Sequence, residues 1–112
     1  MNIAEAIRPT KHALDRFRQR VLPLLPKDTR AEYRKYSQME HLIKRVQLYT
    51  EDFHPAYDGL LKANVFLNFD EIPPIPLTFV INPVNNVIVT LYTQSGWDIT
   101  SNEGEITWRW SA

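Results

Sequence analysis

The chain has 112 residues, of which 44% are hydrophobic and 23% are charged, a composition typical of a soluble globular domain. The absence of cysteine excludes a disulfide framework and a zinc–thiolate site. No apolar run approaches the roughly 18 residues of a membrane-spanning helix, and the first residues lack the apolar segment of a secretory signal. We therefore expect one domain over residues 1–112, without membrane association and in the cytoplasm by default.

Charge is unevenly distributed although the formal net charge is zero. Residues 1–50 contain eleven Lys or Arg and five Asp or Glu, whereas residues 51–112 contain two and eight. A molecule polarised in this way can attract a polyanion to its basic half. The two halves can equally attract each other, or the acidic half can shield the basic one, and the sequence leaves these alternatives open.

Helices are predicted in the first half of the chain. Thr10 suits the N-cap of a helix that ends near Leu22. Thr29 and Glu32 then match a capping box. Apolar residues recur from there at steps of three and four, which predicts one helix of about 20 residues that ends near Thr50.

Strands are predicted in the second half. Residues 61–69 are rich in β-branched and aromatic residues, and residues 77–81 and 87–92 flank a five-residue turn that contains Pro and two Asn, as in a β-hairpin. Residues 105–110 alternate and predict a final strand. We expect an α+β fold in which two or three N-terminal helices pack on a C-terminal antiparallel sheet of about four strands.

Strict alternation in the strand over residues 87–92 predicts which side chains share a face. Val87, Val89 and Leu91 fall on one face, and Ile88, Thr90 and Tyr92 fall on the other. Two hydroxyl groups are therefore expected side by side near the end of this strand.

The first predicted helix has a basic row beside an apolar stripe. At about 100° per residue, His12, Arg16 and Arg20 fall on neighbouring positions. An imidazole moves protons near neutral pH, and a guanidinium binds phosphate, so the row suits phosphodiester chemistry. The simpler alternative is a solvated helix face without a function. The stripe that would face the core contains Ala13, Leu14, Phe17 and Val21.

Motifs for other chemistries are absent from the sequence. It contains no glycine-rich phosphate loop, no HExxH motif and no Gly-x-Ser-x-Gly elbow. The three histidines are not spaced as a metal-binding set. We therefore expect neither a metal nor a cofactor.

Residues 10–21 read TKHALDRFRQRV, and residues 79–92 read FVINPVNNVIVTLY. The first block resembles the opening helix, with its HAxxRxxxR pattern, of the ribonuclease domains that unite barnase, EndoU, colicin and RelE-like nucleases (BECR). The second block looks like the VVxDPxTGxVVTVY hairpin of that group. Together the blocks cover about a quarter of the chain. Asn85 and Asn86 stand where Thr and Gly are usual, which alters the turn chemistry.

The resemblance implies a metal-independent endoribonuclease of toxin type, in which a ribose 2′-OH attacks the adjacent phosphorus. In this mechanism His12 serves as base or acid. Arg16 and Arg20 hold the scissile phosphate. Thr90 and Tyr92 orient the phosphate, and Tyr92 is a candidate second proton donor.

Lys11 and Trp97 are the expected substrate-binding residues, with Trp97 stacking a base from a loop over residues 93–98. RNA is the expected partner, and a cognate antitoxin or immunity protein is a second one. Each residue also has a structural alternative: Arg16 pairs with Glu5 or another acid, and Tyr92 and Trp97 serve in packing.

The alternative function is a non-catalytic protein-binding or regulatory module on the same scaffold. A DNA-binding regulator is a weaker alternative, because no pair of recognition helices is evident. The catalytic hypothesis requires the basic row to converge with the face that carries Thr90 and Tyr92, whereas a binding module allows these residues to scatter.

Overall fold

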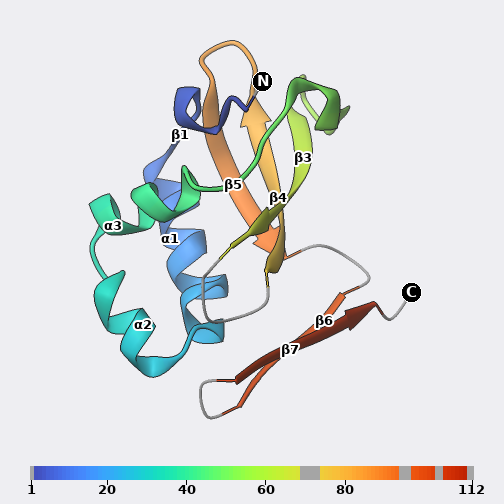
Figure 1. Cartoon of the computed structure of the whole chain (residues 1–112). Coiled ribbons are helices and arrows are strands. Elements are labelled where there is room, and N and C mark those ends of the chain that lie inside the picture. The colour runs from blue at the N-terminus through green and yellow to red at the C-terminus, as the bar shows by residue number, and fades with distance from the viewer. Residues whose placement is uncertain (1, 69–73, 94–96, 103–104, 111–112) are drawn as a thin grey trace.

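The computed structural model describes residues 2–68, 74–93, 97–102 and 105–110, with side chains up to residue 93 (Figure 1). None of the helices in these ranges is long and apolar enough to cross a membrane. The helices are α1 (Lys11–Arg20), α2 (Lys27–Glu32) and α3 (Tyr36–Ile43), with 3₁₀ turns η1 (Ala4–Ala6), η2 (Leu22–Leu24) and η3 (Thr50–Asp52). The strands are β1 (Arg8–Pro9), β2 (Phe53–Pro55), β3 (Leu61–Leu67), β4 (Ile75–Asn82), β5 (Val87–Thr93), β6 (Trp97–Asn102) and β7 (Glu105–Trp110).

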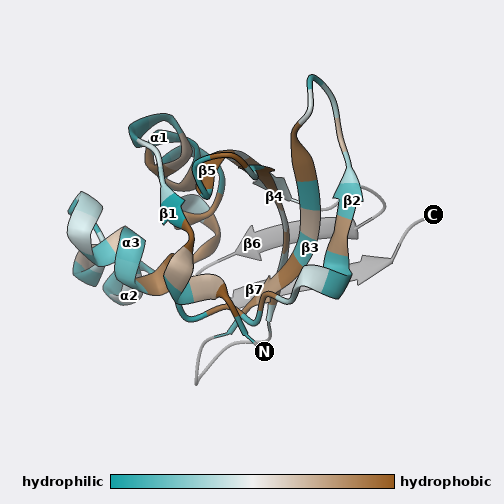
Figure 2. Cartoon of the chain, turned by 90° about the horizontal axis from the view of Figure 1, so that it is seen from above, coloured by the Kyte–Doolittle hydropathy of each residue, from teal (hydrophilic) through white to brown (hydrophobic). Residues whose placement is uncertain are grey.

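The main sheet has the strand order β1-β5-β4-β3-β2, and β6 pairs with β7 in a separate two-stranded sheet. β1 runs parallel to β5, and the other neighbours are antiparallel. The three α-helices lie on the same side of the curved main sheet (Figure 2). The predicted α+β class is therefore confirmed. The strands β1, β2 and β6 were not predicted, because segments this short or this polar carry no clear alternation.

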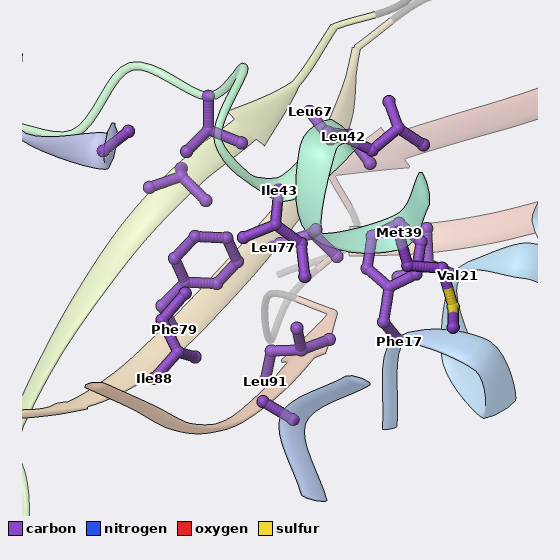
Figure 3. Close-up of a cluster of buried hydrophobic side chains, with 14 of the residues drawn as sticks. Phe17, Val21, Met39, Leu42, Ile43, Leu67, Leu77, Phe79, Ile88 and Leu91 are labelled. Atoms are coloured by element: carbon purple, nitrogen blue, oxygen red, sulfur yellow. The ribbon is translucent and has the colours of Figure 1, made fainter. Parts of the chain in front are cut away.

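The hydrophobic core lies between α1, α3 and the inner face of the main sheet (Figure 3). Phe17 from α1 and Met39 from α3 have no exposed surface, and Phe79 from β4 is 1% exposed. Each buried side chain of this size contributes about 1.5–3 kcal/mol of transfer free energy. The apolar stripe predicted on the first helix is buried throughout, which fixes the direction in which the opposite side of α1 points.

The single helix predicted from Thr29 to about Thr50 is wrong. The structure has two short helices, α2 and α3, separated by residues 33–35. α2 begins before Thr29 and buries no residue, so no apolar face holds it in line with α3. After α3, Val46 and Leu48 are both fully buried, a two-residue spacing that belongs to extended chain rather than to helix.

The predicted hairpin is confirmed as β4 and β5, but strict alternation along β5 is wrong. The pairing shifts between Val80 and Ile81, so that Val89 has no partner across the ladder. This β-bulge adds one residue to β5, so that the residues before it point to the opposite face from the one that strict alternation predicts. As a result, Ile88 joins Leu91 in the core instead of sharing a face with the hydroxyl-bearing residues.

Thr10 joins the start of α1 to β5. As predicted, it is the N-cap, because its Oγ1 accepts a hydrogen bond of 3.1 Å from the Ala13 N–H. The same hydroxyl approaches the carbonyl oxygens of Ile88 at 2.9 Å and Val89 at 3.2 Å. The Thr10 backbone N–H also donates to Ile88, at 3.0 Å. One residue thus starts the helix and holds it against the bulge.

Replacing Thr10→Val is expected to lower the free energy of unfolding by about 1–3 kcal/mol, because the isosteric side chain neither caps the helix nor binds the β5 carbonyls. Thr10→Ser is the control and keeps most of the stability. Urea denaturation followed by circular dichroism measures both. Equal stability of the two variants would show that the hydroxyl does not hold α1 to the sheet.

Candidate functional site

The basic row of α1, defined as His12, Arg16 and Arg20, lies at the border between the core-facing side of the helix and solvent. Arg16 is half-buried, and its Nε contacts His12 Nε2 at 3.4 Å, while its Nη1 donates to Gln19 Oε1 at 2.9 Å. His12 and Arg20 are exposed residues. The row is therefore continuous along the helix and accessible to a ligand from solvent.

Arg20 connects the basic row to β5. Its Nη1 donates a hydrogen bond of 2.7 Å to the backbone carbonyl of Leu91. β1 pairs only with the first two residues of β5, and among the described residues no strand pairs with this edge of β5 beyond them. Arg20 and the Thr10 hydroxyl bind carbonyls along that edge in place of a strand. A guanidinium has five N–H donors, so Arg20 keeps donors for a further partner.

Thr90 and Tyr92 lie on the outer face of the main sheet, opposite the core. They pair with Val80 and Thr78 of β4, and both are half-buried. Leu91, which receives the Arg20 hydrogen bond, lies between them in the strand. The hydroxyl pair predicted on a common face is therefore present, and it lies next to the strand residue that Arg20 contacts.

The outer face also carries polar residues that the sequence analysis missed. Thr78 is 4% exposed, and its hydroxyl donates to Asn64 Oδ1 at 2.8 Å. The register places Lys62 in the row of Val80 and Thr90, and Asn64 in the row of Thr78 and Tyr92. These residues come together only through the pairing of β3 with β4. The residue pattern of one strand does not show which residues of another strand lie opposite it.

The remaining predicted site residues are Lys11 and Trp97. Lys11 is exposed at the first position of α1. Trp97 begins β6 instead of lying in a loop, because this part of the chain pairs with β7, and its side chain lies outside the described part of the structure. The alternative in which Arg16 pairs with Glu5 or another acid is not found among the described residues. Arg16 contacts His12 and Gln19, and the ion pair in this part of the chain joins Lys44 and Glu40.

The contact between Arg16 and His12 defines how the imidazole can act. In this contact Arg16 Nε is the donor and His12 Nε2 is the acceptor, so the guanidinium lies against a ring nitrogen that can take up a proton. A neutral imidazole beside a guanidinium can take a proton from a hydroxyl group while the guanidinium binds an adjacent anion. Among the described residues, no group of three or more His, Asp or Glu is arranged to hold a metal ion.

Arg20→Ala is expected to lower the free energy of unfolding by about 1–2 kcal/mol, because it leaves the Leu91 carbonyl without its charged donor. Arg16→Ala is the matched control, since its contacts stay on the helix surface, and should change stability by less than about 0.5 kcal/mol. Chemical denaturation of both variants measures the difference. Equal losses would mean that the Arg20 contact does not secure the edge of β5.

Comparisons with known proteins found no match: no family model matches the sequence, and neither a curated protein nor a solved structure matches the chain.

Proposed function

We propose that the protein is a metal-independent endoribonuclease of toxin type, with its site along the basic row of α1 and the adjacent part of β5. The main support is the hydrogen bond from Arg20 to the Leu91 carbonyl. It joins the basic row to the strand segment that carries Thr90 and Tyr92. Thr90 and Tyr92 lie on the outer face of the sheet, so the proposal requires the RNA to reach both groups around the edge of β5.

The proposed reaction needs a base, an anion site and an acid. Arg16 leaves His12 Nε2 to bind the phosphate, and His12 Nε2 then takes the proton of a ribose 2′-OH, whose oxygen attacks the adjacent phosphorus. Arg16 and Arg20 bind the non-bridging oxygens as negative charge develops. The bond from phosphorus to the 5′-oxygen breaks, and Tyr92 donates the proton to that oxygen, while Thr90 orients the phosphate. The products are a 2′,3′-cyclic phosphate and a 5′-hydroxyl end.

RNA suits the charge distribution of the chain. The excess of basic residues falls within residues 1–50, which include α1. Lys11, at the start of the helix, extends the positive charge beyond His12, and Trp97 is the proposed base-stacking residue. The proposal assigns the protein to the cytoplasm, the compartment of its RNA substrate. An antitoxin or immunity protein with an acidic surface would cover the basic row.

His12→Ala should reduce cleavage of single-stranded RNA in EDTA by about 100-fold or more, because general acid–base catalysis contributes at least that factor. The matched control is His41→Ala, which removes an exposed histidine from α3. Mass spectrometry of the products should find 2′,3′-cyclic phosphate ends, and the same sequence as DNA should stay intact. Full activity of His12→Ala would refute the mechanism.

Arg16→Gln tests the phosphate contact separately from catalysis. Loss of one phosphate contact lowers the slope of log K against log salt concentration by about 0.7 for a single strand. Fluorescence anisotropy with a 2′-O-methyl RNA, which cannot be cleaved, measures the slope. Arg45→Gln removes an exposed charge outside the basic row and should leave the slope unchanged. An unchanged slope in Arg16→Gln would exclude Arg16 from the phosphate site.

The second candidate is a non-catalytic module that binds a protein partner through the outer face of the sheet. Phe66 of β3 favours it, because this large apolar side chain is 44% exposed on that face. A folded protein that leaves RNA uncut at every salt concentration would favour this candidate over the ribonuclease.

A further inference from the structure

A pocket of about 360 Å³ opens between the end of α1, η2 and α2. It lies on a different side of α1 from the basic row: Arg18 is two residues from both Arg16 and Arg20, and therefore about 160° from each around the helix. We call it the basic pocket. Its lining consists of Arg18, Leu22, Pro23, Lys27, Arg30 and Arg34.

Among the residues whose side chains the structure describes, the lining of the basic pocket has four cationic side chains and no acidic one. The ion pair found among the described residues, Lys44–Glu40, does not involve any of the four. Like charges held close together repel each other, and a concave surface of one sign concentrates counter-ions. The unbalanced charge therefore favours a ligand with several negative charges.

Arg18 is held in place before any ligand arrives. Its Nη2 donates to the backbone carbonyl of Arg34 at 3.0 Å, and its guanidinium lies 4.6 Å from the centre of the Tyr36 ring. The Tyr36 hydroxyl in turn donates to the carboxylate of Asp15. An arginine fixed by such contacts loses little conformational freedom when it binds an anion, which favours affinity.

We propose that the basic pocket binds a compact ligand that carries several linked phosphates. Its volume lies within the range of about 300–1,000 Å³ that is usual for small-molecule sites. The four positive charges suit the roughly four negative charges of a triphosphate, and Leu22 and Pro23 offer apolar contact to the rest of the ligand. Because the site does not use the basic row, it goes beyond the proposed RNA cleavage and does not depend on it.

Isothermal titration of the full chain at low salt and without divalent cations tests the proposal. Inorganic triphosphate should bind with a dissociation constant below about 1 mM, and orthophosphate should bind at least tenfold more weakly. The double variant Arg30→Gln/Arg34→Gln should lose at least tenfold in triphosphate affinity. It keeps the Arg34 carbonyl that positions Arg18.

Two controls make the result specific. Arg8→Gln/Arg45→Gln removes two exposed charges elsewhere and should bind triphosphate as the wild type does. His12→Ala should also bind normally, so that failure of the ribonuclease proposal and failure of this one are separate results. The proposal is overturned if triphosphate does not saturate the wild type, if orthophosphate binds equally well, or if both double variants bind alike.

Further ligands identify the source of the phosphates. Adenosine triphosphate that binds more tightly than inorganic triphosphate would indicate a free nucleotide that uses the apolar lining. A 5′-triphosphate RNA that binds more tightly than its 5′-hydroxyl counterpart, with the preference lost in Arg30→Gln/Arg34→Gln, would indicate an RNA end. Equal affinity for all triphosphates would assign recognition to the phosphates alone. Each of these outcomes supports a site for linked phosphates.

Discussion

The packing of α1 against β5 determines which way the side chains of the helix point and how the edge of the main sheet is closed. At one end of the helix, the Thr10 hydroxyl caps the first turn and binds carbonyls at the β-bulge. At the other end, Arg20 binds the Leu91 carbonyl. These contacts satisfy the backbone groups of an edge that β1 leaves uncovered. They also fix the rotation of the helix, because Phe17 must face the core at the same time.

Two basic surfaces follow from that rotation. With the apolar stripe buried, the basic row lies on the side of α1 that reaches the β5 edge, and Arg18 lies on another side, in the basic pocket. The short helix α2 contributes to the pocket because it is not packed in the core. A continuous helix through residues 27–43 would have placed its arginines differently around α1. Arg34, which lies in the break between α2 and α3, is part of the same lining.

The two arginine environments also differ in what they can do. Arg16 lies beside the His12 imidazole, an arrangement that pairs an anion site with a proton acceptor. Arg18 lies on an aromatic ring and a backbone carbonyl, and the described lining of the pocket contains cationic and apolar side chains. The basic row is thus suited to chemistry on a phosphodiester, and the pocket is suited to binding.

Residue patterns along the chain were sufficient to predict the α+β class, the N-cap at Thr10, the buried stripe of α1 and the β4–β5 hairpin, because each depends on local periodicity or capping. They also predicted that Thr90 and Tyr92 share a face, since both residues follow the bulge together. Other features became visible only in the folded chain. The bulge that buries Ile88, the break before α3 and the parallel β1 depend on contacts between distant segments, which local patterns do not encode. The same holds for the pairing of Arg20 with Leu91 and for the convergence of four cations on one pocket.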